Sequence, residues 1–283
     1  MRVLPKRLFQ IVLVSLLVAG GTAQAQNQPL RTAVDANFPP HAFTRLDGKL
    51  DGFQIDLGTE LGRRLGREVQ VDGTNFAGLI PALNAGRYDF ILAPVTATTE
   101  RAENLFLTEG YLFTAYQFGI RRGSAPITGV GDLRGKIIAV NKGSAYDGWT
   151  RENAERYGFT PLVLDTFTDA TLAVVQNRAY AQLGGNTTIR YAAQRNRQFT
   201  ADLVLRDTRA HWSLVARRGD TAMREMLENA LECMKLDGTL AKLSEKWFGT
   251  APEADDAERV AFPGYGVPGL PGYDPAPHTP RCN

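Results

Sequence analysis

The stretch GLIPALNAGRYDFILA, residues 78–93, places a helix signal directly before a strand signal. Pro81 fits the first turn of a short helix and Gly86 ends it, because proline is tolerated at a helix start and glycine favours the position after the last turn. The apolar run 88–93 then predicts a buried strand. The same alternation extends over residues 30–248, with further strands expected at 30–34, 136–140, 162–164 and 214–217. It predicts an α/β fold with a mostly parallel sheet covered by helices.

The composition is that of an ordinary globular chain. Its 283 residues are 43% apolar and 22% charged, which excludes a disordered, collagen-like or multi-span membrane protein. The length suffices for two lobes of roughly 100 to 150 residues. The net charge of +2 is far from the strongly basic character of proteins that bind phosphate backbones, so we expect no nucleic-acid partner.

Residues 1–25 have the organisation of a secretory signal peptide. Three basic residues precede the apolar run 8–19, and Ala-Gln-Ala at 23–25 puts small residues where signal peptidase reads them. An uncleaved membrane anchor is the alternative, but the run is about half the roughly 20 residues that a span needs. We expect cleavage after Ala25 and export, which takes the net charge from +2 to −1.

The C-terminal residues 250–283 form a separate segment. They hold seven of the 15 prolines and show no helical or strand period, which predicts an irregular tail over the surface. An oxidising compartment would let Cys233 and Cys282 pair, closing a loop of about 50 residues and stabilising the fold by roughly 4 kcal/mol. The alternative is one buried helix cysteine and one unpaired cysteine at the chain end. No Cys/His cluster has metal-ligand spacing, and we expect no cofactor.

Seven motifs occur in the order found in one known family. They are DANFPP (35–40), GFQIDL (52–57), FAGLIPAL (76–83), TATTERA (96–102), GS (143–144), NTT (186–188), and DGTL with KWFG (237–240 and 246–249). Over residues 30–249 the chain therefore resembles the periplasmic solute-binding proteins of ABC importers, in particular the polar amino-acid type.

The resemblance implies a two-lobed fold of the type II periplasmic-binding-protein kind, with two hinge crossings. Lobe one would comprise residues 26–116 and 214–249, and lobe two residues 117–213, with crossings near 116–119 and 211–215. It also implies a periplasmic monomer without chemistry of its own. Such a protein holds an amino acid or related small carboxylate between its lobes and delivers it to a permease in the inner membrane.

On lobe one, the resemblance assigns the ligand's carboxylate to Arg101. A guanidinium group is always charged, and its planar fork matches two carboxylate oxygens. Thr96 is expected to add its hydroxyl or its backbone N–H at the same end of the ligand. The alternative is a surface arginine paired with Glu100 or Glu103, worth under about 1 kcal/mol.

On lobe two, Gly143, Ser144 and Ala145 follow a predicted strand and precede a predicted helix. Their N–H groups are expected to point at the same anion, as at other helix N-termini. Full binding energy would then exist only in the closed form, so the ligand would shift the population toward closure. The alternative is an ordinary helix cap. Asn186 and Thr187 are also expected close to the ligand.

Three further residues match ligand-facing positions of the family. Phe38 and Phe76 would place aromatic rings against the ligand's side chain, although phenylalanines also serve as plain core residues. Asp35 would meet a basic end of the ligand, or it caps the loop that it begins.

Other positions depart from the family's pattern. Gly185 stands where an acidic residue receives the ligand's α-ammonium, Pro94 replaces Gly or Ser, and Gln54 replaces an acid. A buried ammonium without a counter-charge is costly. Either Asp35, Asp147 or the Pro94 carbonyl takes over this role, or the ligand lacks the ammonium.

Two other functions are compatible with the resemblance. A lyase like the cyclohexadienyl dehydratases would eliminate water from a carboxylate in the same cleft, which needs a general acid. Gly185 argues against it, and the histidines at 41, 211 and 278 have neither catalytic nor metal spacing. His41 is expected on an exposed loop, and the alternative is a position at the cleft mouth in contact with the ligand. A non-transport periplasmic scaffold or assembly factor is favoured by the departures and by the tail. We expect no enzymatic activity.

Overall fold

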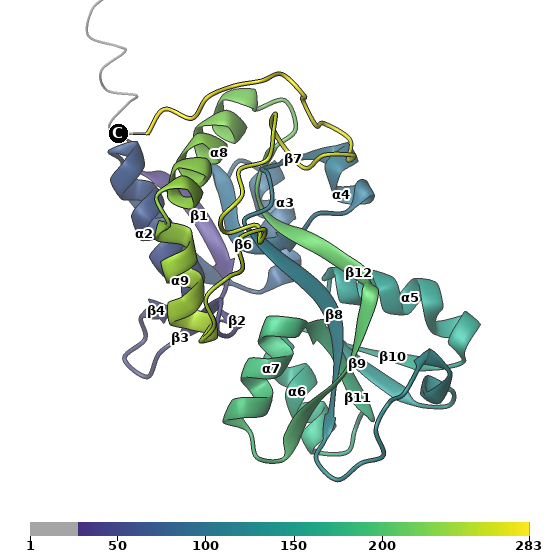
Figure 1. Cartoon of the computed structure of the whole chain (residues 1–283). Coiled ribbons are helices and arrows are strands. Elements are labelled where there is room, and N and C mark those ends of the chain that lie inside the picture. Colours follow the sequence, from purple (N-terminus) through teal and green to yellow (C-terminus); the bar gives the residue numbers. More distant parts are fainter. Residues whose placement is uncertain (1–27, 283) are drawn as a thin grey trace, which may run out of the picture.

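A computed structural model describes residues 28–282, and the predicted signal peptide lies outside these residues. Two groups of helices and strands are joined by two long strands, β8 (Leu112–Arg121) and β12 (Phe199–Arg217), which cross from one group to the other (Figure 1). The predicted two-lobed α/β fold is thereby confirmed. No helix among residues 28–282 is long and apolar enough to cross a membrane.

Lobe one contains the N-terminal elements and the helices that follow β12 (Figure 1). Strand β1 (Leu30–Asp35) lies parallel to β5 (Val69–Thr74), while β6 (Phe90–Thr96) and β7 (Leu105–Leu107) pair antiparallel with β12. Short strands β2 (Asn37–Phe38), β3 (Ala42–Thr44) and β4 (Leu50–Asp51) form a small meander. The helices are α2 (Phe53–Leu65), α3 (Leu79–Asn84), α4 (Thr99–Asn104), α8 (Thr221–Leu236) and α9 (Thr239–Phe248), with a 3₁₀ turn at Phe76–Gly78.

Lobe two is built on the other half of the sheet that contains β6, β7 and β12. This sheet is mixed, and the prediction of a mostly parallel sheet is wrong, because the crossing strands β8 and β12 pair antiparallel with each other and with their neighbours. Strand β9 (Ile137–Asn141) pairs in parallel with β10 (Thr160–Leu164) and β11 (Ala181–Gly185), and β11 runs antiparallel to β8. Helices α5 (Ala145–Tyr157), α6 (Phe167–Val175) and α7 (Asn186–Arg195) surround the sheet, with a 3₁₀ turn at Val130–Leu133. Strand β9 leads through a short loop into α5, and β11 leads directly into α7. Arg101 and His41 of lobe one contact Gly143 and Thr187, so both helix starts face lobe one.

The two crossing strands pair with each other on both sides of the hinge. Their ladder is interrupted between Ala201 and Val204 and between Leu205 and Ala210. A further shift in the β12–β6 ladder, between Ser213 and Val215, lies opposite Pro94. Proline has no N–H to donate to a ladder, which explains the irregular pairing at that point.

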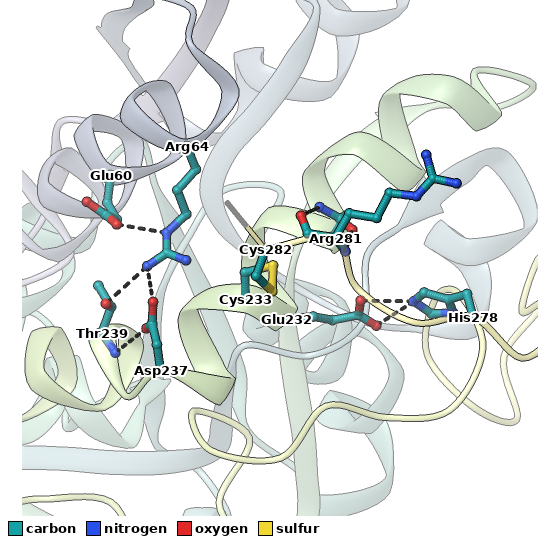
Figure 2. The surroundings of a disulfide bond; sticks show 10 residues. Glu60, Arg64, Glu232, Cys233, Asp237, Thr239, His278, Arg281 and Cys282 are labelled. Atoms are coloured by element: carbon teal, nitrogen blue, oxygen red, sulfur yellow. Dashed lines mark hydrogen bonds and ion pairs between the residues drawn. A yellow bond between two sulfur atoms is a disulfide. The ribbon is translucent and has the colours of Figure 1, made fainter.

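Residues 250–282 of the tail have no helix or strand, apart from one isolated bridge between Tyr265 and Asp274. It runs back over lobe one along α8 (yellow in Figure 1). Cys233 of α8 forms a disulfide with Cys282 (Figure 2). Close by, His278 Nε2 lies 2.7 Å from Glu232 Oε1, so side-chain contacts as well as a covalent bond dock the end of the tail.

Candidate functional site

Outside the crossing strands β8 and β12, three side-chain hydrogen bonds among residues 28–282 join one lobe to the other. Arg101 Nη2 donates to the Gly143 carbonyl at 3.2 Å, and Thr168 Oγ1 donates to the Asn37 carbonyl at 3.4 Å. His41 Nε2 lies 2.9 Å from Thr187 Oγ1. The structure therefore shows the lobes in a closed arrangement.

Arg101 lies between the lobes, on the short helix α4. Thr98 caps this helix by accepting the Arg101 N–H. The guanidinium donates from Nη1 to the Thr96 carbonyl at 2.8 Å and lies 5.5 Å from the ring centre of Phe76. Burial lowers the pKa of Arg101. None of the ion pairs within residues 28–282 includes Arg101, so this partly buried cation has no carboxylate partner there.

Two tyrosines that the sequence analysis did not single out lie near Arg101. The rings of Tyr116 and Tyr146 meet edge to face at 4.9 Å, and both side chains are buried. Burial raises the pKa of each phenol, so both stay neutral at ordinary pH. Tyr146 directly follows the Gly-Ser-Ala motif and Tyr116 falls at the predicted crossing, which are the signals that point to them.

The amides on lobe two are not all free, which corrects one expectation. Gly143 N donates to Asp147 Oδ2 at 2.9 Å, and Ser144 N donates to the Asn141 carbonyl at 3.3 Å. Ser144 is also the N-cap of α5, whose first residue is Ala145. What lobe two presents to Arg101 in the closed form is the Gly143 carbonyl. Asp147 also pairs with Arg151 and is not available to a ligand ammonium.

An aromatic cluster fills the space beside Thr96. Trp212, which is 1% exposed, donates from Nε1 to Thr96 Oγ1 at 3.0 Å. Phe38 packs edge-on against Trp212 and against Phe167 of lobe two. His41 packs on Trp212 with 4.5 Å between ring centres. The prediction of an exposed His41 is wrong: the side chain is fully buried, and burial lowers its pKa to about 3.

Gly185 leaves room for this cluster at the junction of β11 and α7. A Cβ atom there would lie 2.7 Å from Tyr146 Oη and 3.0 Å from Trp212 Cζ2. Trp212 and Tyr146 therefore occupy the space into which any side chain at position 185 would extend. A tryptophan in the predicted crossing was a visible signal, but its direction depends on pairing across β12 that the sequence does not specify.

Asp35 lies at the end of β1, where it is 1% exposed. Its Oδ1 accepts the Asn37 N–H at 3.1 Å, so the predicted loop cap is present. Its Oδ2 is buried without a hydrogen-bond partner among residues 28–282. Burial raises the pKa of Asp35 to about 6, and a neighbouring cation does not offset this effect.

The remaining positions of interest are structural in the closed form. Gln54 is buried and donates to the Leu92 carbonyl and to Tyr111 Oη. Pro94 is buried inside β6. Asn186 Oδ1 accepts the Ala115 N–H at 3.3 Å, which ties the start of α7 to the hinge strand β8. Within residues 28–282, no group of three or more His, Cys, Asp and Glu side chains is arranged to hold a metal ion.

Comparison with known families identifies the class of protein. Residues 30–250 match the bacterial extracellular solute-binding proteins, family 3, and the chain belongs to this family.

Individual relatives are receptors for amino acids. The chain is 26% identical to the putative amino-acid ABC transporter-binding protein PatH of Vibrio harveyi, over 86% of this chain and 98% of the relative. It is 27% identical to the L-cystine-binding protein TcyJ of Escherichia coli, over 78% and 82%. The L-arginine-binding protein of Pseudomonas aeruginosa is 24% identical, over 86% and 96%.

Solved structures similar to this chain belong to the same class of binding proteins. An ancestral arginine-binding protein bound to arginine has a TM-score of 0.74 and 30% identity, covering 79% of this chain and 100% of its own. The ancestral amino acid-binding protein AncCDT-1, a precursor of cyclohexadienyl dehydratase, has a TM-score of 0.71 and 28% identity, covering 78% and 95%. Both support the two-lobed fold.

Proposed function

We propose that this protein is the periplasmic substrate-binding component of an ABC importer, which holds an amino acid or related small carboxylate between its lobes and delivers it to a permease. The proposal rests on the environment of the Arg101 guanidinium. Its guanidinium is desolvated, lies between the lobes, and has carbonyl and ring contacts but no carboxylate in residues 28–282. A ligand carboxylate would supply the missing counter-charge.

The contact with Gly143 explains how such a ligand would control closure. Arg101 Nη2 reaches the Gly143 carbonyl only when the lobes are together. A carboxylate held by the guanidinium and by the Ala145 N–H, the first amide of α5, would form a charge-assisted bond that joins the two lobes beside this contact. Because that bond needs both lobes, the ligand would favour the closed population.

The rest of the ligand would lie among the aromatic residues. Phe76 stacks beside Arg101 and Phe38 borders Trp212, so both offer ring faces or edges to an apolar stem. Asp35 has one buried oxygen without a partner, which suits a hydrogen-bond donor on the far end of the ligand. The relatives named for cystine and arginine support an amino acid as the ligand class.

The test is a thermal-shift panel of amino acids, opines and organic acids on the mature protein. A ligand present at about 100 times its Kd stabilises a protein by roughly 2.7 kcal/mol, or about 2 to 4 °C at this size. Arg101→Ala is expected to abolish the shift. The matched control is Arg156→Ala on α5, an exposed arginine that stacks on Tyr157 and should keep the full shift.

Two outcomes would contradict the proposal. An undiminished shift in Arg101→Ala would place the ligand elsewhere. If no compound of the panel shifts the melting temperature, the scaffold alternative is favoured. The tight packing of His41 and Trp212 between the lobes is also compatible with that alternative. Mass spectrometry of small molecules that copurify with the protein would identify the ligand, and its recovery unchanged after incubation is the result expected of a receptor.

A further inference from the structure

A cavity between the lobes lies apart from Arg101. Its volume is about 460 Å³, within the range of small-molecule sites. Its walls come from α7 of lobe two, from β8 and α9 of lobe one, and from residues 250–258 at the start of the tail. Figure 1 shows the end of α9, where the tail begins, on the side of lobe one that faces α7.

The contact between His41 and Thr187 separates this cavity from the cleft. Thr187 lines the cavity, whereas His41 packs on Trp212, whose Nε1 binds Thr96 beside Arg101. Arg101 itself does not line the cavity. A ligand in one space therefore has no direct contact with a ligand in the other.

The two lobes contribute opposite charges to the cavity. Lobe two contributes Arg190, and the tail contributes Glu253, Asp256 and Glu258. None of these four takes part in an ion pair within 4.0 Å among residues 28–282. A cation and several carboxylates thus line the same cavity without forming ion pairs with each other.

Glu258 is the most constrained of these acids. It is 5% exposed, and its Oε1 accepts the Ser244 hydroxyl at 2.9 Å. A buried carboxylate normally has a cationic partner, because desolvation of the charge is costly. Among residues 28–282 its side-chain hydrogen-bond partner is a neutral hydroxyl, and burial raises the pKa of Glu258 by more than the charge of Lys235 lowers it.

The acidic wall is also held in place. Glu253 N donates to Asp256 Oδ2 at 2.8 Å, which fixes a turn. Two residues after Glu258, the Val260 carbonyl accepts a hydrogen bond from the buried Lys235 Nζ at 3.0 Å. The family match ends at residue 250, so this acidic wall lies outside the matched residues.

From these contacts we propose that the cavity is a second small-molecule site, for a zwitterion with an ammonium group and an anionic group on a short apolar stem. The ammonium binds Glu258 and Asp256, the anionic group binds Arg190, and the stem lies on Phe113 and Phe248. The site does not depend on the function proposed for Arg101. Because both lobes line it, its occupant favours the closed form in the same way as a cleft ligand.

The test uses the mature full-length chain carrying Arg101→Ala, so that the cleft does not contribute. Isothermal titration with the zwitterions 4-aminobutyrate and 6-aminohexanoate is compared with butylamine and butyrate, which carry one charge each. Saturable binding of a zwitterion, at least about tenfold tighter than either single-charge probe, is expected from the loss of one charge-assisted contact. Glu258→Gln and Arg190→Ala should each weaken this binding by about tenfold or more.

Matched controls are Glu245→Gln and Arg197→Ala, which change exposed residues outside the cavity and should leave binding unchanged. Circular dichroism verifies that each variant is folded. The proposal is overturned if no zwitterion binds below about 10 mM, if butyrate or butylamine binds equally well, or if the controls weaken binding as much as the cavity variants. A null result here leaves the Arg101 panel, run on the unmodified chain, as an independent test of the receptor function.

Discussion

The cleft and the junction between the tail and lobe one each contain a cation removed from bulk water, fully at Lys235 and partly at Arg101, and the two cations have different partners. In the junction, Lys235 Nζ lies 2.6 Å from Glu109 Oε1, with both side chains inaccessible to solvent. It also donates to the carbonyls of Gly110 and Val260. In the cleft, Arg101 has two carbonyls and the face of Phe76 but no carboxylate in the described chain.

This difference separates a permanent contact from an exchangeable one. A buried charge whose partner belongs to the same chain holds two segments together at all times. A buried charge without such a partner destabilises the empty protein and is retained where a ligand supplies the partner. Asp35, with a buried oxygen that has no partner among residues 28–282, follows the second pattern.

The largest effect is expected at Lys235. Lys235→Met would leave Glu109 buried without its cation, and loss of one member of a buried pair costs about 3 to 5 kcal/mol. Urea denaturation monitored by circular dichroism measures the change in the free energy of unfolding. The double variant Lys235→Met/Glu109→Gln, which removes both charges, should recover a large part of the loss. A single variant as stable as the wild type would show that the pair does not hold the junction.

The disulfide should come next. Cys233→Ser combined with Cys282→Ser opens a loop with a sequence separation of 49 residues, for which a loss of about 2 to 4 kcal/mol is typical. Since the junction lies apart from Arg101, the thermal shift caused by a cleft ligand should persist. If that shift disappeared while the variant remained folded, the separation between the two regions would be wrong.

Asp35→Asn should raise stability in the neutral range. The folded pKa of about 6 lies above the ordinary value of 3.8, so the native state binds its proton more tightly than the unfolded chain. The wild type therefore loses stability as the pH rises from about 3.8 to about 6, where the buried carboxyl loses its proton. An amide at this position does not ionise, so at neutral pH the variant avoids a cost of burying the charge of about 1 to 3 kcal/mol. Thermal melts between about pH 4 and pH 7.5 test this. A gain that did not shrink toward low pH would contradict the assignment.

The smallest effect is expected at Gly185. An alanine methyl group would press on Tyr146 Oη and on Trp212, and modest overpacking costs about 1 kcal/mol or slightly more. Gly148→Ala, inside α5 with no atom near its added Cβ, is the matched control and should be neutral or stabilising. Equal stability of both variants would mean that Trp212 does not occupy this space.

Much of this organisation could be predicted from the sequence. Strands β1, β6, β9 and β10 begin and end within three residues of their predicted positions, because short apolar runs bounded by helix signals are local features. The 19 residues of β12 were predicted only at their end, since its first part is partly exposed and is defined by pairing with β8. Such pairing is a long-range property.

In the site, too, local features could be predicted from the sequence and long-range contacts could not. The position of Arg101 between the lobes agrees with what the motif implied, although its role in binding stays a proposal. The burial of His41 and the orientation of Trp212 depend on how the lobes meet, for which the local sequence carries no signal. The same holds for the Gly143 amide, because its bond to Asp147 Oδ2 is decided by a side-chain rotamer.

The most direct test of the account is the stability of Arg101→Met in protein that has been refolded from denaturant to remove any copurified ligand. If Arg101 is reserved for a ligand's negative charge, removing it should leave the free energy of unfolding within about 1 kcal/mol of the wild type, or raise it. A loss of about 3 to 5 kcal/mol, equal to that expected for Lys235→Met, would show that the fold itself supplies the partner of Arg101, and would contradict the account.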